Sequence, residues 1–123
     1  MKFTTISIII AVVLIGGALL LTRSNGAANN VTIIDGKQIV DITAKGRYSP
    51  RVSLAKADVP TTLRVETNGT FDCTAGLTIP AINYRANLPP SGVTEIEIPS
   101  QKPGTTLQGL CVMGMYNFKV KFN

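Results

Sequence analysis

The chain has 123 residues and a formal net charge of +5, with a pI near 9.5. It contains no histidine, which excludes Ser-His-Asp triads, Cys-His dyads and imidazole-ligated metals, and removes the usual general base near neutral pH. We therefore expect a protein that is not an enzyme. The basic residues are scattered and are not interleaved with aromatic residues, so we also expect no nucleic-acid partner.

The chain begins with a long apolar stretch. Residues 3–21 are almost unbroken in their apolar character, and a helix of that length, at about 1.5 Å per residue, crosses a hydrocarbon layer of about 30 Å. We expect residues 1–22 to be a transmembrane anchor and residues 23–30 a linker. The alternative is a signal sequence cleaved near Gly26-Ala27-Ala28. Both interpretations predict an extracytoplasmic domain, held at the cell membrane by a single pass or secreted.

From Val31 onward, short β-type segments replace the apolar run. Asp35-Gly36, Asn68-Gly69 and Pro103-Gly104 are turn signals. We expect residues 46–50 to form a loop, residues 81–91 a long irregular connection, and no soluble helix. Seven or eight short strands with frequent turns are typical of an all-β Greek-key sandwich, here over residues 31–123. The expected strands are residues 31–35, 38–44, 51–55, 61–67, 77–80, 93–98, 105–112 and 116–122.

Sulfur donors are concentrated near the C-terminus. Cys111, Met113 and Met115 lie within five residues of one another, and thiolate and thioether sulfurs are soft donors suited to Cu(I). On a strand these three residues would share one face, whereas on a loop Gly114 would let the backbone curl so that the sulfurs converge. The other cysteine, Cys73, lies far upstream and would have to be brought in by the fold. We expect all four sulfurs to share one metal site.

A disulfide between Cys73 and Cys111, beside a methionine-rich core, is the leading alternative. An exported protein with two cysteines commonly forms one, and closing a loop of roughly forty residues adds about 4 kcal/mol in the chain-entropy model. Such a domain would be an immunoglobulin-like binding or assembly module without metal. The absence of tryptophan counts against it, because these domains pack a tryptophan against the disulfide.

Several motifs together resemble a cupredoxin-like domain over residues 31–123, of a bacterial type with a Cys…Cys-x-Met-Gly-Met pattern. They are Gly46-Arg47-Tyr48-Ser49-Pro50, Cys73 after a strand and turn, the late Pro103-Gly104 turn, and Cys111-Val112-Met113-Gly114-Met115 before a terminal strand. The Cys-x-Met-Gly-Met motif is the specific part of the resemblance.

The resemblance implies positions for the metal ligands. Compared with blue-copper members, Cys73 stands where the first histidine is expected, and Cys111 matches the cysteine directly. Met113 stands near the second histidine and Met115 near the axial methionine. Without imidazole a His₂Cys Cu(II) site cannot form, which makes electron transfer the least favoured function, whereas a Cys₂Met₂ set favours Cu(I).

The resemblance also implies a role in copper handling at the cell envelope. We expect an extracytoplasmic copper-binding protein that sequesters or delivers Cu(I) through Cys73, Cys111, Met113 and Met115. Its expected partners are the copper ion, the membrane through the N-terminal anchor, and an envelope copper transporter or redox partner.

Overall fold

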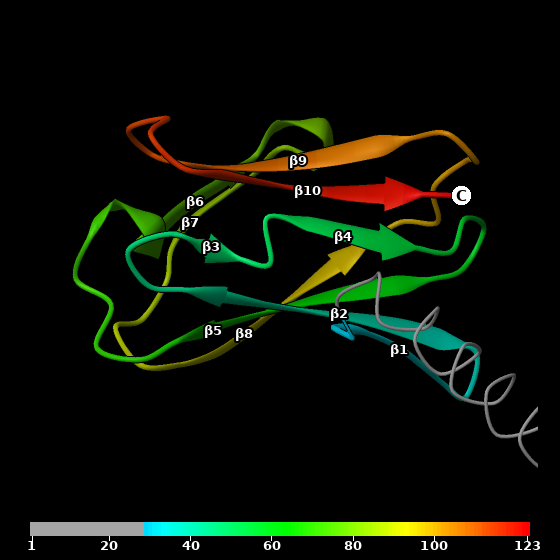
Figure 1. The fold of residues 1–123 in the computed structure, drawn as a ribbon, viewed down its shortest axis with the longest axis horizontal. Helices are drawn as coiled ribbons and strands as arrows, with labels where there is room; N and C mark the ends of the chain where they lie inside the picture. Colours follow the sequence, from blue (N-terminus) through cyan, green and yellow to red (C-terminus); the bar gives the residue numbers. More distant parts are fainter. Residues whose placement is uncertain (1–28) are drawn as a thin grey trace, which may run out of the picture.

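A computed structural model describes residues 29–123, which form ten strands in two sheets that face each other (Figure 1). The first sheet has the order β1 (Val31–Ile34), β2 (Lys37–Ala44), β5 (Thr61–Thr67) and β8 (Gly92–Ile98), with β3 (Tyr48–Ser49) paired to the end of β2. The second has the order β4 (Val52–Ala55), β10 (Asn117–Phe122), β9 (Thr106–Cys111), β6 (Gly76–Ile79) and β7 (Tyr84–Asn87). The prediction of an all-β sandwich is therefore confirmed.

The predicted N-terminal helix falls on residues that the structure does not describe. Within residues 29–123, no helix has the length and apolar character needed to cross a bilayer.

Turn chemistry and alternation of side chains explain the framework. Asp35 and Gly36 have φ values of 51° and 75°, the positive values that a two-residue hairpin between β1 and β2 requires. In β10, Phe118, Val120 and Phe122 are completely buried, because alternate residues of a strand face the core. The Phe118 ring meets the buried Tyr48 ring edge-on, with centroids 5.0 Å apart, which joins β10 to β3 across the two sheets.

Two strands and two short helices were missed by the sequence analysis. β3 lies where residues 46–50 were expected to form a loop, and β7 lies inside the expected irregular connection 81–91. Both are short, and each is a strand only because a neighbour supplies its hydrogen bonds: β2 for β3, and β6 for β7. The 3₁₀ helices η2 (Cys73–Ala75) and η3 (Pro80–Ile82) are single turns, too short to leave a periodic pattern in sequence.

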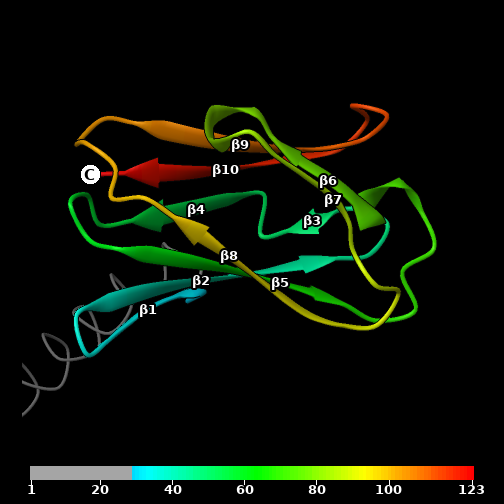
Figure 2. The same cartoon turned by 180° about the vertical axis from the view of Figure 1, so that it is seen from behind.

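The chain crosses between the two sheets, and segments that are far apart in sequence therefore lie together at one end of the sandwich. β2 and β5 are parallel neighbours in the first sheet, and β4, which lies between them in sequence, pairs in parallel with β10 in the second. The β9–β10 loop and η2 lie at the end of the sandwich opposite the C-terminus (Figures 1 and 2). The candidate site is at this end.

Candidate metal centre

Cys111 is the last residue of β9, and a tight loop follows it. The Gly114 N–H donates to the Cys111 carbonyl at 2.9 Å, and the Cys111 N–H donates to the Tyr116 carbonyl at 3.0 Å. Gly114 has a φ of 72°, a value that a residue with a side chain rarely adopts. The structure therefore has residues 112–116 as a loop and not as a continuation of the strand, which decides between the two conformations considered from sequence.

Cys73 is held by a capped turn. It opens η2, and the Asp72 carboxylate accepts hydrogen bonds from the Thr74 N–H at 2.8 Å and from the Thr74 hydroxyl. The other Asp72 oxygen accepts the Gly46 N–H at 2.8 Å. Asp72 thus ties η2 to the segment that precedes β3, and these hydrogen bonds to the carboxylate lower the pKa of Asp72.

Tyr48 supports the same turn from inside the core. Its hydroxyl donates to the Thr74 carbonyl at 3.2 Å. Burial, followed by the negative charges that Cys111, Cys73 and Asp72 can carry, raises the pKa of Tyr48, so the hydroxyl stays protonated and remains a donor. The side chain fixes the position of η2 relative to β10, because its ring also packs on Phe118.

The fold brings the two cysteines together. Their sulfurs lie 3.2 Å apart although the residues are 38 positions apart in sequence, and both are free thiols. Cys111 is buried and Cys73 is partly buried. The cysteine half of the predicted sulfur cluster is therefore assembled in the structure.

The two methionines occupy the loop that follows Cys111 and are largely exposed. Met113 is 71% exposed and Met115 is 68% exposed. Met115 lines a shallow depression with Arg47 and Tyr116. The buried part of the candidate centre is thus the cysteine pair, and participation of the methionines stays a prediction.

The two thiols differ in acidity. Burial alone would raise the pKa of Cys111, but hydrogen bonds to its sulfur lower it. The strongest comes from the Tyr116 N–H, 3.4 Å from the sulfur, and the others come from the Cys73 thiol and the N–H groups of Met115 and Met113. The contact with Cys111, followed by burial, raises the pKa of Cys73 to about 11. Cys111 is therefore the more acidic of the two thiols, and Cys73 is the one that donates to the sulfur of the other.

Sequence analysis did not assign roles to Asp72, Tyr48 or Thr74. Asp72-Cys73-Thr74 carries a usable signal, because aspartate is a preferred N-cap that accepts from the N–H two positions on. Within the described residues, no three His, Cys, Asp or Glu side chains gather as a metal site. Met113 and Met115 are the other sulfur-containing residues within residues 29–123.

Several dozen solved chains match this fold, among them a metal-binding domain and a copper-binding protein. One is the metal-binding domain of the Streptococcus pneumoniae D39 Cu(I)-exporting P-type ATPase CopA with Cu(I), with 15% identity, a TM-score of 0.68, and coverage of 76% of this chain and 92% of that one. The other is a copper-binding protein in its apo form, with 22% identity, a TM-score of 0.68, and coverage of 76% and 94%.

The family comparison covers nearly the whole chain. No curated protein is a significant match, whereas the model of the cupredoxin-like domain matches residues 9–122. On this match and on its two-sheet architecture, the chain belongs to the cupredoxin-like domain family.

Proposed function

We propose that this protein binds Cu(I) through Cys73 and Cys111, with Met113 and Met115 completing the site, and sequesters or delivers the ion outside the cytoplasm. The observation that carries the proposal is the 3.2 Å separation of two reduced sulfurs at the start of a Met-Gly-Met loop. The choice of metal is supported by the two structural neighbours, since one is a metal-binding domain with Cu(I) and the other a copper-binding protein.

The donor set favours Cu(I) over other metals. A structural zinc site needs four cysteine, histidine or carboxylate ligands, and within residues 29–123 no three such side chains gather. Calcium and magnesium need oxygen donors, and the nearest carboxylate, Asp72, already accepts three hydrogen bonds. Two thiolates and flexible thioethers suit Cu(I).

The exposure of the methionines supports a role in transfer. Methionine has three rotatable side-chain bonds, so Met113 and Met115 can swing from solvent toward an ion held by the buried thiol pair. A partner could reach the same exposed thioethers. We propose binding and transfer, not catalysis, at the cell membrane through the anchor predicted for residues 1–22, with an envelope copper transporter or redox partner as the recipient.

The experiment is a competition titration of the reduced full-length protein, in zwitterionic detergent, with Cu(I) and a chromophoric chelator. We expect one tightly bound Cu(I) per chain. Changes to residues that only orient metal ligands typically cost 10–100-fold, so loss of a thiolate ligand in Cys73→Ser should weaken binding by at least about 100-fold. A neutral thioether is a weaker ligand than a thiolate, so Met115→Leu should weaken binding by only about 10-fold. Val112→Leu is the matched control, since Val112 is exposed in the same loop and carries no donor.

A second candidate is favoured by the same cysteine pair. Two free thiols with sulfurs 3.2 Å apart need little movement to form a disulfide, and the domain would then be a disulfide-stabilised binding or assembly module. In the titration, binding that is lost in Cys73→Ser but unchanged in Met115→Leu would leave only a thiol pair. Failure of the reduced wild type to bind Cu(I) would favour the module.

A further inference from the structure

Charged residues are segregated between the two sheets. The strands of the second sheet, β4, β6, β7, β9 and β10, contain no aspartate or glutamate but carry Arg85, Lys119 and Lys121. The strands of the first sheet hold four carboxylates, those of Asp41, Glu66, Glu95 and Glu97. The second sheet is therefore the positive side of the sandwich.

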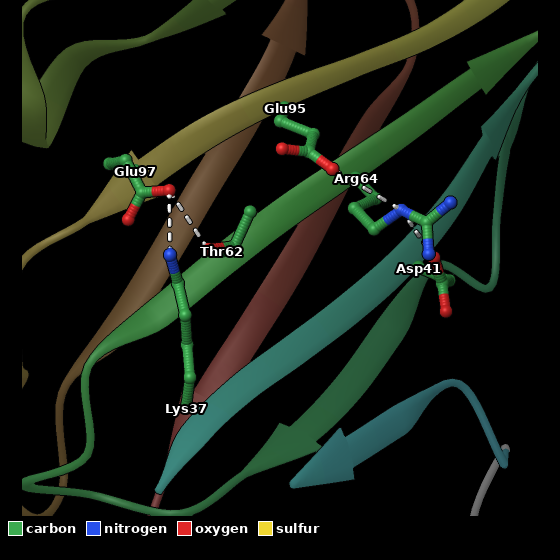
Figure 3. A network of polar contacts seen from close by, with 6 residues as sticks. All are labelled: Lys37, Asp41, Thr62, Arg64, Glu95 and Glu97. Carbon is green, nitrogen blue, oxygen red and sulfur yellow. Dashed lines mark hydrogen bonds and ion pairs between the residues drawn. The ribbon is translucent and has the colours of Figure 1, made fainter. Parts of the chain in front are cut away.

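The bases of the first sheet are already paired. Figure 3 shows Lys37 with Glu97, at 3.0 Å, and Arg64 between Asp41 and Glu95, at 3.7 and 4.0 Å. These pairs are exposed and add little stability, but they partly neutralise that face. The outward side of the first sheet thus offers an acidic partner no free cluster of bases.

Next to the candidate metal centre, by contrast, exposed bases gather without carboxylates beside them. Two shallow depressions of about 320 Å³ each adjoin there and share Arg51 and Asn117. We call them together the basic groove: Arg47, Arg51, Asn117 and Lys119, with Met115 at one end. No acidic residue lines either depression. The groove therefore contains the exposed Met115 of the Met-Gly-Met loop together with three bases.

The three bases of the groove come from separate segments, and within residues 29–123 no carboxylate pairs with them. Arg47 precedes β3, Arg51 lies between β3 and β4, and Lys119 is on β10, where its N–H donates to the Arg51 carbonyl at 2.8 Å. All three are exposed, and among residues 29–123 none of them forms an ion pair. Exposed bases gathered in this way attract acidic partners and steer their approach.

We propose that the basic groove docks an acidic polypeptide segment of the protein that exchanges copper with this one. The inference rests on the proposed function, because it identifies the partner of the same site. Two arginine forks can each bind a carboxylate through paired hydrogen bonds, which would place the partner's own metal ligands beside Met115. A membrane on this surface would instead cover the exposed methionine and block the exchange.

The test uses a fluorescein-labelled octaglutamate peptide as probe, with the reduced full-length protein in zwitterionic detergent and fluorescence anisotropy as readout. Because like charges placed together in an interface cost several kcal/mol, Arg51→Glu with Lys119→Glu should weaken peptide binding by at least about 10-fold. The control is Lys56→Glu with Lys102→Glu, which changes net charge equally. Both control residues are exposed and lie near the end of β10, since Ala55 pairs with Phe122 and the Gly104 N–H donates to the Phe122 carbonyl. This variant should lose less than about threefold.

Three results would overturn the docking proposal. One is an absence of measurable peptide binding by the wild type, and another is an equal loss in the groove and control variants, which would mean that only net charge matters. The third comes from NMR of the protein in lipid nanodiscs: if phosphatidylglycerol shifts the signals of Arg51 and Lys119 and the peptide does not, the groove is a membrane contact. Copper affinity separates the two proposals, since the groove variant should bind Cu(I) like the wild type. Peptide binding by a wild type that binds no Cu(I) would contradict the proposed function and would leave the groove as a site for an acidic segment of a partner that does not exchange copper.

Discussion

The sulfurs of Cys73 and Cys111 lie 3.2 Å apart, yet the pKa values of the two thiols are shifted in opposite directions. The N–H of Tyr116 and the Cys73 thiol outweigh burial and lower the pKa of Cys111, whereas the pKa of Cys73 is raised to about 11. If the pair binds Cu(I) as proposed, the ion has to displace the protons that remain on the two sulfurs, because thiolates are the ligands. A metal bound by both sulfurs would therefore have to displace the Cys73 proton, which is the more strongly held of the two.

Copper affinity should therefore depend on pH. Between the lowered pKa of Cys111 and the value of about 11 for Cys73, each bound ion releases one proton, so the apparent association constant should rise about tenfold per pH unit. Below the pKa of Cys111 two protons are released and the dependence should steepen. Competition titrations across a pH series measure this slope. A constant affinity from about pH 6 to pH 8 would show that the protons are not displaced.

At the scale of the elements, the position of Cys73 depends on the hydrogen bonds that hold η2 against the sandwich. The Asp72 carboxylate caps η2 and also binds the Gly46 N–H, and the Tyr48 hydroxyl binds Thr74 in the same turn. These contacts place Cys73 against the end of β9. The turn has only three residues, so its position comes from these contacts and not from any helical preference of its own.

Replacing the cap should therefore affect both stability and metal binding. Asp72→Ala should lower the free energy of unfolding by about 1 kcal/mol at pH 7 and weaken Cu(I) binding by about 10-fold. Because the pKa of Asp72 is lowered in the fold, its contribution is present above the ordinary aspartate pKa and is lost as pH falls through the lowered value.

The predicted pH dependence can be tested by urea denaturation of the wild type and of Asp72→Ala, at pH 7 and in acid. The stability difference should shrink in acid, and the exposed Glu66→Ala on β5 serves as a control with no such cap. A difference that persists unchanged in strong acid would mean that the Asp72 charge is not what holds η2.

The elements also show where prediction from sequence ends. The strand expected over residues 116–122 is present as β10, and the Asp35-Gly36 turn signal marks a turn that the structure contains. By contrast, β3 has two residues and β7 has four, which is too short for a clear alternation of apolar and polar residues. Each pairs with the strand just before it in sequence, β2 or β6, and η2 is a single turn held by side-chain contacts. Elements of this length leave little local pattern, which is why they were not predicted.

Across the whole molecule, the sandwich brings together residues that are far apart in sequence, such as Cys73 and Cys111. The donor types alone indicated which residues could bind copper, but only the pairing of β6 with β9 and the placement of η2 bring Cys73 to Cys111. The exposure of Met113 and Met115 was not predictable, because it depends on the conformation of a loop with few packing contacts. A bound ion would link η2 to the β9–β10 loop.

Loading with copper should stabilise the whole domain. A ligand that binds only the folded state, at a free concentration about 1,000 times its Kd, adds about 4 kcal/mol to the free energy of unfolding. The melting temperature of the reduced protein should rise with Cu(I) by several degrees, and Cys73→Ser should not show the rise. An equal rise in both proteins would indicate binding elsewhere on the chain.

The central claim is that one Cu(I) ion is held by both cysteine sulfurs and by methionine sulfur. Its most direct measurement is X-ray absorption of the Cu(I)-loaded full-length protein labelled with selenomethionine, recorded at the copper and selenium edges, with Met113→Leu/Met115→Leu for comparison. We predict copper surrounded by sulfur and selenium, with a copper–selenium signal that the double variant lacks. Copper ligated by oxygen or nitrogen, or a selenium edge without copper as a neighbour, would contradict the claim.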